Sequence, residues 1–514
     1  FFEMGVFDPM AGQRWRGEDL VPDTDDPETR RYIEATAFTD EGRAVLTLPP
    51  DRDFTLYISR GIEYDMVTIP VRVAAGEALN LSARLKRVVD TTGYISADFH
   101  LHAAPSPDSE LDLPTRVRTV VAEGVELLVA TDHNFVTDYG PTLDALGLRD
   151  FASSMVGLEM TTLESGHFNG FPLKRAPGKI TGGAFEWSQR PPAELFDSIR
   201  ALGAVAPDEV FVQVNHPRDS ILGYFAQYQL DPLTGKVTPS RDCSNVGADV
   251  IDAVADCLIA PNGAAFRTEE GQLAFSHDFD AIEVLNVATN GQFFHKRIPK
   301  NFADLDVPEA LLEADPPVGA ILCDEDDEVA YPGVFDDWFN LLNLGYRYLG
   351  TGTSDSHSAT DRTGAGRTFV YVGHDQPSKL SDQSVVEAMR TGRVFATTGP
   401  IIEFFVDGQP MGSDLRAEAG KVKLEVNIQA APWINVDEGV IWINGVDRER
   451  FEVTLVDGRA QWRKEISLTE DSWLIAQVHS EQNLFPIYRP ADIPPILIDD
   501  AVETIAGPLG FFGN

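Results

Sequence analysis

The stretch 117-VRTVVAEGVELLVATDHN-134 carries the pattern that decides the fold class. Its first nine residues have the apolar spacing of an amphipathic helix, and the apolar run that follows ends in Asp132 and His133. The same order of helix, short apolar strand and polar strand end recurs in 193–218 and in 338–357. Strands that alternate with helices predict an α/β layer whose polar residues collect where the strands end.

The pattern changes on both sides of this region. Residues 1–92 and residues 401–514 alternate apolar and polar residues between Pro, Gly and Asp, which predicts a β-sandwich at each end, the second of them immunoglobulin-like. Residues 93–400 form the α/β domain, and residues 219–275, rich in Pro, Gly and Asp, are interpreted as an insertion over it. Three domains agree with a length of 514 residues, since one domain takes roughly 100–200 residues.

The composition excludes some classes of partner. The chain holds 81 acidic and 41 basic residues, so its formal net charge is −40 and is spread along the sequence. This charge repels nucleic acid and anionic membranes, and we expect neither as a partner. No apolar run approaches the length of about 18 residues that spans a membrane. A first residue other than Met, together with the flanking β domains, leads us to expect an exported protein, periplasmic or extracellular.

Metal-capable side chains gather at the ends of the predicted strands. His100 and His102 lie two residues apart in 93-GYISADFHLHAAPSPDS-109, so they face the same side of a strand. Taken alone, such a pair is as often structural as metal-binding, and core histidines with N-capping aspartates would explain any single position. Six of the ten histidines follow the pattern, however, and buried ionisable groups are costly unless they are paired or metal-bound. The set comprises Asp98, His100, His102, Asp108, Asp132, His133, Glu159, His167, His216, Asp355 and His357.

The chemistry of this set indicates the type of metal. Ligands of α/β sheets gather at the carboxyl ends of the strands, which is where these residues fall. Imidazole mixed with carboxylate suits Zn, Mn or Fe, whereas Mg or Ca calls for oxygen ligands. The three cysteines have no CxxC spacing and none belongs to the set, which argues against structural zinc.

A series of short motifs in this order resembles a known family. They are "DFHLH" (98–102), "SPDS" (106–109), "ATDHN" (130–134), "GLEMTT" (157–162), "GHFNGF" (166–171), "NHPR" (215–218), "GTSDSH" (352–357) and "GRVFATTGP" (392–400). The set resembles the PHP (polymerase and histidinol phosphatase) superfamily of metal-dependent hydrolases, and more closely its CehA/McbA-like branch. The resemblance covers roughly residues 93–410 and implies a distorted (β/α)7 barrel with two or three divalent metal ions at the C-terminal ends of its strands.

The resemblance also implies a ligand set for each metal position. The first position would take His100, His102, Glu159 and Asp355, the second Glu159, His167 and His216, and the third Asp108, His133 and His357. Asp98 and Asp132 would stand behind these ligands and orient neighbouring histidines, which is a common role of carboxylates beside metal-bound imidazole.

These ligands lead to an expected reaction. Two cations that share Glu159 would lower the pKa of a bridging water from about 15.7 towards about 7 and so provide a metal-bound hydroxide. We therefore expect a metal-dependent hydrolase of small-molecule esters, with Glu159, Asp355 and Arg218 as catalytic residues. A phosphate mono- or diester, extending to phosphotriesters, is the first expectation, because Arg218 follows His216 closely and its forked donors could hold a phosphoryl oxygen. A surface or structural ion pair is equally open for Arg218.

Two alternatives to a phosphoesterase stay open. The CehA/McbA-like branch implies aryl ester or carbamate (amide) hydrolysis, and a non-catalytic metal-binding surface or carbohydrate-associated protein is the second alternative. Three more residues are candidates for substrate contact. Tyr224 lies among aromatic residues that would line a pocket or pack beneath a loop, and Glu283 and Asn286 belong to "EVLN" (283–286), which resembles a family motif.

Overall fold

The computed structural model describes most of the chain. The described residues are 35–162, 165–219, 222–228, 230, 237, 274–286, 333–360, 363–480 and 484, with the short strands β1 (Gly5–Asp8), β2 (Gln13–Arg16), β12 (Lys296–Pro299), β13 (Leu322–Cys323) and β14 (Glu328–Tyr331). Most of the predicted insertion at 219–275 lies outside the described residues.

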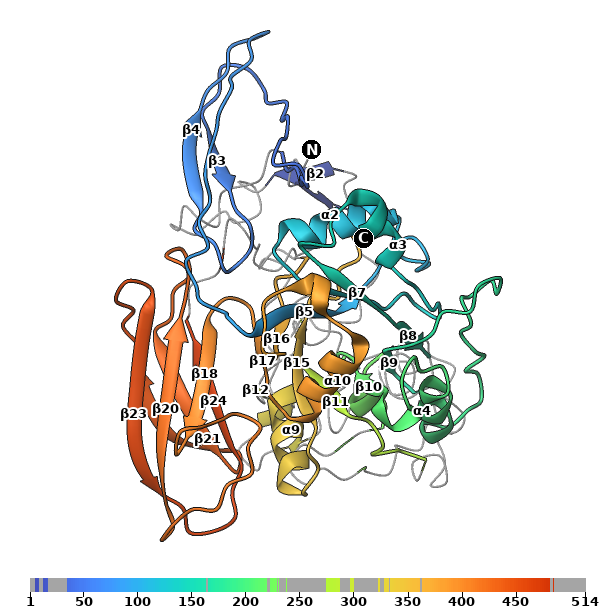
Figure 1. Cartoon of the computed structure of the whole chain (residues 1–514), viewed down its shortest axis with the longest axis vertical. Coiled ribbons are helices and arrows are strands. Elements are labelled where there is room, and N and C mark those ends of the chain that lie inside the picture. The colour runs from blue at the N-terminus through green and yellow to red at the C-terminus, as the bar shows by residue number, and fades with distance from the viewer. Residues whose placement is uncertain are drawn as a thin grey trace.

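Two five-stranded sheets form the centre of the molecule (Figure 1). The first has the order β17 (Val394–Thr397), β16 (Arg367–Tyr371), β5 (Tyr94–Leu101), β6 (Leu127–Ala130) and β7 (Ser153–Val156). The second has the order β15 (Leu349–Thr353), β11 (Ala281–Asn286), β10 (Phe211–Val214), β9 (His167–Phe171) and β8 (Leu158–Thr161). Strands β5 to β7 pair in parallel, as do β10, β11 and β15, and the other pairs are antiparallel. The described strands thus form a mixed α/β architecture of two sheets and not one closed barrel.

The two sheets meet at two places. β7 continues into β8 through Gly157 alone. At the other place the end of β5 lies beside the chain that follows β15, because the amide of Asp355 donates to the carbonyl of His100 at 3.0 Å and the amide of His102 donates to the carbonyl of Ser356 at 3.1 Å. The carboxyl ends of two parallel-running segments from different sheets are therefore side by side.

Helix α2 (Leu113–Ala122) packs against the first sheet through the apolar face that its sequence predicts. It begins at Asp112, whose side chain accepts from the amide of Thr115 and so caps a free N–H group. Its apolar residues Val117 and Val120 pack with α3 (Gly140–Leu146) and β6 in one cluster. The helix and strand expected from 117–134 are therefore confirmed. The other long helices are α4 (Pro192–Arg200), α9 (Val334–Asn343) and α10 (Asp382–Arg390), and none of the described helices is long and apolar enough to cross a membrane.

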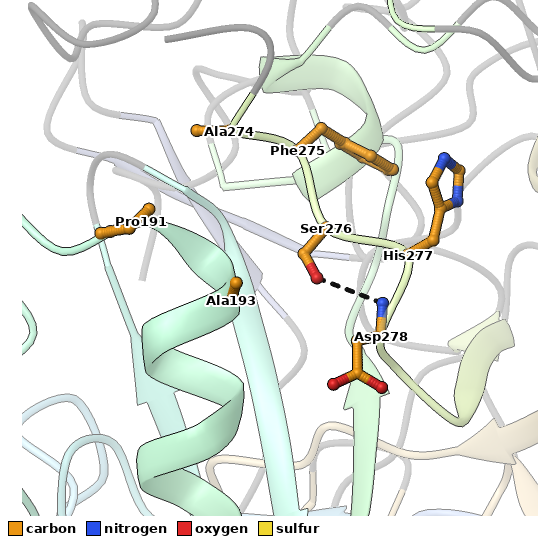
Figure 2. Close-up of a pocket in the computed structure, with 7 residues that line it drawn as sticks. All are labelled: Pro191, Ala193, Ala274, Phe275, Ser276, His277 and Asp278. Carbon is orange, nitrogen blue, oxygen red and sulfur yellow. Dashed lines mark hydrogen bonds between the residues drawn. The ribbon is translucent and has the colours of Figure 1, made fainter. Parts of the chain in front are cut away.

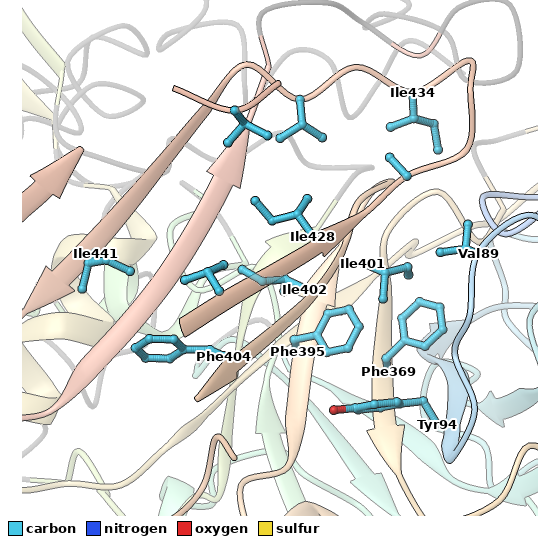
Figure 3. Packing of buried hydrophobic residues seen from close by; sticks show 14 of the residues in the cluster. Val89, Tyr94, Phe369, Phe395, Ile401, Ile402, Phe404, Ile428, Ile434 and Ile441 are labelled. Carbon is cyan, nitrogen blue, oxygen red and sulfur yellow. The ribbon is translucent and has the colours of Figure 1, made fainter. Parts of the chain in front are cut away.

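The C-terminal region consists of two antiparallel sheets around one core. The sheets have the orders β19 (Gln409–Pro410), β18 (Ile401–Val406), β20 (Lys421–Gln429), β23 (Arg459–Ser467) and β22 (Val446–Glu452), β21 (Glu438–Ile443), β24 (Leu474–His479). Ile402, Ile428 and Ile441 from these sheets share a cluster with Phe369 and Phe395 of the central sheet (Figure 3). This shared core joins the C-terminal sheets to the α/β region. Strand β23 was not predicted, because most of its side chains are polar or charged and the apolar alternation is weak.

The described part of the N-terminal region has fewer strands than its alternating sequence predicts. Its described residues form two antiparallel pairs, β1 with β2 and β3 (Phe54–Ile58) with β4 (Val67–Val71). The alternating segment 42–50 is not a strand, and Val45 is 93% exposed. Alternation alone does not make a strand, since the backbone groups also need a neighbouring strand with which to pair.

Glu126, at the start of β6, should make stability depend on pH. It accepts a hydrogen bond from the amide of Ser96 at 3.0 Å, and burial, followed by the negative charge of Glu63, raises its pKa from 4.5 to about 7. The folded protein therefore keeps a proton that the unfolded chain has lost, so the stability that this proton provides is full at low pH and is lost as the pH rises through about 7. Glu126→Gln cannot ionise and keeps an acceptor oxygen for Ser96. We expect the free energy of unfolding of the variant, measured in urea, to rise relative to that of the wild type by about 2 kcal/mol as the pH is raised from 5 to 8. A difference that is constant with pH would contradict this account.

Candidate metal centre

Glu159 lies at the centre of the candidate site. It is fully buried on β8, and the side-chain Nδ2 of Asn215 donates to its Oε1 at 2.8 Å. Imidazole nitrogens of five histidines surround its two oxygens. They are His100 Nε2 at 3.3 Å, His102 Nε2 at 3.7 Å, His133 Nδ1 at 2.5 Å, His167 Nδ1 at 3.1 Å and His216 Nε2 at 3.7 Å. One carboxylate thus meets side chains from β5 and β9 and from the segments that follow β6 and β10.

Two more carboxylates extend the cluster. Asp355 Oδ1 lies 3.2 Å from the Nε2 atoms of both His100 and His102. Towards the outside, Asp108 Oδ2 lies 3.0 Å from His133 Nε2 and 3.3 Å from His357 Nε2. All nine predicted ligands are therefore brought together, although they come from positions spread over more than 250 residues of sequence, from 100 to 357.

The geometry groups these atoms in nearly the expected way. In each of three groups one ligand atom of every member lies within 4.8 Å of the others: His100, His102 and Asp355; His133, Glu159 and His167; and His102, Asp108, His133 and His357. The first group lacks only Glu159 of the expected first position, and the third group holds the three expected ligands together with His102. The second differs, because His133 takes the place expected for His216, whose Nε2 is 3.7 Å from Glu159.

The ring nitrogens of these histidines are better placed to bind a divalent metal ion than to form hydrogen bonds within the cluster. Within the described chain, Nε2 of His100 and of His102, both ring nitrogens of His167 and Nδ1 of His216 are buried and make no well-formed hydrogen bond. Buried polar atoms are normally satisfied, so ring nitrogens without a hydrogen bond beside ionised carboxylates are suited to coordinate a cation. Imidazole and carboxylate are the donors that Zn, Mn and Fe accept. The cluster can therefore hold divalent metal ions.

The charges of the cluster are strongly coupled. Burial alone would raise the pKa of Glu159, but the positive charges of His133, His167 and His100 hold it well below its usual value. Burial would likewise lower the pKa of His133, but Glu159 and Asp108 raise it to about 10. Burial and the charges of His357 and His133 keep the pKa of His102 well below its usual value. The carboxylates thus stay ionised, as metal ligands must be.

Two ligands sit on an unusual backbone. His216 has φ = +26° and Asp355 has φ = +50°, in the left-handed region that side chains other than glycine rarely adopt. Such conformations cost on the order of 1–3 kcal/mol each and persist where the surroundings enforce them, often at functional sites. At Asp355 the enforcing contact is the hydrogen bond from its amide to His100.

Asp98 and Asp132 do not orient imidazole rings as expected. Asp98 accepts from the amide of Ser354 at 3.1 Å, from its hydroxyl at 2.5 Å and from the amide of His100 at 3.2 Å. Asp132 accepts from the amide of Ala103 at 2.7 Å. Both carboxylates therefore hold the backbone of ligand-bearing segments, and burial raises the pKa of each to about 6. The carboxylate that faces an imidazole from behind is Glu283, whose Oε1 lies 2.8 Å from His100 Nδ1.

Two further residues, not expected from the sequence, support the centre. The buried guanidinium of Arg116 donates to the carbonyls of His102 at 2.7 Å and Ser356 at 2.8 Å. The hydroxyl of Ser106 accepts from the amide of His133 at 2.9 Å and lies 2.9 Å from His102 Nδ1. A signal for Arg116 existed, because it interrupts the apolar face of α2 that Val117 and Val120 continue.

The structure corrects the substrate roles expected of Arg218 and Tyr224. Arg218 is almost completely buried, and its guanidinium makes an ion pair with Asp337 of α9, with Nε at 2.6 Å from Oδ2, and donates to the carbonyl of Leu230 at 2.6 Å. Tyr224 is fully buried, stacks on Phe275 at 4.5 Å and accepts a hydrogen bond from the amide of Ser276 at 2.8 Å. The donors that a phosphoryl group would need are therefore occupied, and both side chains serve packing.

Arg218→Ala should consequently affect stability more than substrate choice. The substitution leaves the fully buried Asp337 without the guanidinium, and breaking a buried ion pair costs about 3 kcal/mol. We expect urea unfolding to show this loss, with a much smaller loss in Arg149→Ala, whose pair with Asp144 is exposed. A selective loss of phosphodiester turnover at unchanged stability would instead support the expected contact between Arg218 and a phosphoryl oxygen of the substrate.

A surface hollow lies away from the centre. It has a volume of about 700 Å³ and is lined by Pro191, Ala193 and residues 274–278 (Figure 2). In it Ser276 Oγ accepts from the amide of Asp278 at 3.2 Å. None of the nine predicted ligands lines this hollow, so it does not share chemistry with the metal centre.

Comparison with known proteins does not assign this chain to a family. No protein-family model matches the sequence, and no curated protein is significantly similar to it. The chemistry assigned to this chain therefore depends on the geometry of its own residues.

Proposed function

We propose that this protein is a metal-dependent hydrolase that acts on small-molecule esters. The observation that carries the proposal is one connected cluster of six imidazoles and three carboxylates, in which five of the histidines face the buried Glu159. We further propose that the two central sheets are the halves of the distorted (β/α)7 barrel that the motifs imply, with β-sandwich domains on either side. Their junctions at Gly157 and at Asp355 support this relation.

Each of two or three ions would have its own set of ligands. His100, His102, Glu159 and Asp355 would hold the first ion, Glu159, His167 and His216 the second, and Asp108, His133 and His357 a third. When bound, these ions supply Lewis acidity and lower the pKa of water towards about 7. The inner ligands are buried, so they exclude bulk water and fix the reacting groups in a site of low dielectric constant.

The outer residues bring the substrate and move the proton. Asp108 and His357 have the most exposed side chains of the set, at 43% and 26%, so the substrate approaches from their side. Burial opposes a proton on His357, but its hydrogen bond to Asp108 raises the pKa of His357. In a two-ion form, His357 holds a proton at Nε2 and passes it to the leaving oxygen.

The placement of Arg218 removes the expected arginine clamp from the argument for a phosphate substrate. Since its guanidinium is engaged by Asp337, the metal ions are the positive charges that would meet a phosphoryl group. Phosphate mono-, di- and triesters remain the first candidates. Aryl esters and carbamates are the second candidate class, because an uncharged carbonyl needs no arginine clamp.

The test begins with the metal. Metal content of the purified protein is measured, the ions are removed with a chelator, and Zn, Mn or Fe is added back in the presence of nitrophenyl phosphate mono-, di- and triesters, carboxyl esters and aryl carbamates. We expect bound transition metal and turnover that disappears with the chelator and returns with the metal. A protein that binds metal but hydrolyses no member of the panel would favour the non-catalytic, metal-binding surface or carbohydrate-associated protein.

Asp108→Asn should reveal how many ions are bound. Its carboxylate is the only one in the outer group, so its loss removes charge and a ligand from the third position alone. We expect the ion count to fall from three to two, with the exposed Asp144→Asn as the unchanged control. Equal counts of two in all three proteins would show that the third position is not used.

A further inference from the structure

Glu283 joins two ligands that come from different strands. It is buried on β11, and each of its oxygens accepts two hydrogen bonds. Oε1 accepts from the hydroxyl of Thr353 and from His100 Nδ1, the latter at 2.8 Å. Oε2 accepts from the amide of His216 at 2.6 Å and from Asn286 Nδ2 at 2.8 Å. One carboxylate thus holds the ring of a first-position ligand and the backbone of a second-position ligand.

Each of these contacts has a consequence for metal binding. A carboxylate against Nδ1 keeps the proton of His100 on that nitrogen, so the lone pair of Nε2 faces Asp355 and Glu159. The bond to the amide of His216 holds a residue whose φ of +26° would otherwise relax. The direction of one imidazole and the place of another therefore depend on the same side chain.

We propose that Glu283 is a positioning residue that couples the first and second metal positions and does not contact the substrate. The inference deepens the proposed function, on which it rests in taking the cluster to bind metal. It also gives a role to Asn286, whose amide donates both to Glu283 and to Asp355 Oδ2 at 3.1 Å. Asn286 fixes the two carboxylates relative to each other.

Only a carboxylate fits this position. Glutamine has one acceptor oxygen and one NH2 group. If its oxygen faces His100 and Thr353, its NH2 group opposes the backbone N–H of His216, and in the reverse orientation it opposes the protonated Nδ1 of His100. Glu283→Gln must therefore lose one of the two ligand contacts while the shape of the side chain is kept.

The test measures metal affinity without substrate. Wild type, Glu283→Gln and the matched control Glu126→Gln are stripped of metal and titrated with Zn²⁺ and Co²⁺. Glu126 is a partly buried carboxyl at the start of β6 that accepts from the amide of Ser96. Because partners behind a metal-bound histidine typically change affinity about 10- to 100-fold, we expect a loss of this size in Glu283→Gln only. The visible spectrum of bound Co²⁺ should change, and the amide of His216 should exchange faster with deuterium.

Distinct results would overturn the inference. Wild-type affinity and an unchanged Co²⁺ spectrum in Glu283→Gln, together with lost turnover, would mean that Glu283 contacts the substrate. If this variant does not fold, Thr353→Val tests the same contact, because it removes one donor that fixes Oε1. Its affinity should fall about threefold, and an unchanged affinity would overturn the inference. A protein whose metal affinity depends on Glu283 but which hydrolyses nothing would refute the proposed function alone.

Discussion

Replacing Glu159 with glutamine is expected to reduce turnover by about 10³-fold or more, equivalent to about 4 kcal/mol of lost transition-state stabilisation. Among the described carboxylates, Glu159 alone faces ligands of all three positions, with imidazole nitrogens of five histidines between 2.5 and 3.7 Å from its oxygens. Glutamine keeps its shape but removes the negative charge that balances the ions and one of two ligand oxygens. At least one bound ion should therefore be lost as well.

The measurement pairs metal content with rate. Glu126→Gln makes the same chemical change in a carboxyl outside the centre, and it should keep the full ion count and the full rate. Circular dichroism of the metal-free proteins checks that Glu159→Gln folds. If Glu159→Gln kept both its metal content and its turnover, the cluster around Glu159 would not be the site of hydrolysis, and the enzyme proposal would fail.

The ligands could be predicted from sequence because local patterns determine where they lie. A period of two residues along β5 places His100 and His102 on one face, and polar residues that end an apolar run fall at the edge of a sheet. Asp108 lacks this signal, because it lies in the loop after β5, and it was expected only from the family resemblance. The pairing of the strands has no local sequence signal. The antiparallel partners of β5 and β10 and the division into two sheets are therefore seen only in the structure.

The contacts of Glu283 and Arg116 could not be predicted, because their partners are distant in sequence. Glu283 meets His100 across 183 positions, and Arg116 meets Ser356 across 240. Asp98 was the natural candidate for orienting a histidine because it lies two residues from His100, yet in an extended strand its carboxylate reaches the backbone and not the ring. Proximity in sequence misled in the same way at Arg218, where the turn at His216 directs the guanidinium towards α9.

Arg116→Met is expected to lower the free energy of unfolding by about 3 kcal/mol in metal-free protein, because it leaves buried acceptors unsatisfied. The guanidinium donates to the carbonyls of His102 and Ser356 and to the hydroxyls of Ser356 and Thr363, at distances of 2.7 to 3.1 Å. Methionine has a similar length and fills the space, so the loss reports the hydrogen bonds and not a cavity.

The control lies two residues along the same helix. Arg118 pairs with Asp40 near the surface at 2.9 Å, and its side chain is 37% exposed, so Arg118→Met should cost about 0.5 kcal/mol or less. Urea unfolding in a chelator compares the two variants. Arg116→Met should also weaken the outermost ion most, because Arg116 holds the segment that carries His357 against the end of β5. Losses of equal size in the two variants would mean that Arg116 does not join these segments, and that the backbone bonds between β5 and the chain after β15 hold the centre together without it.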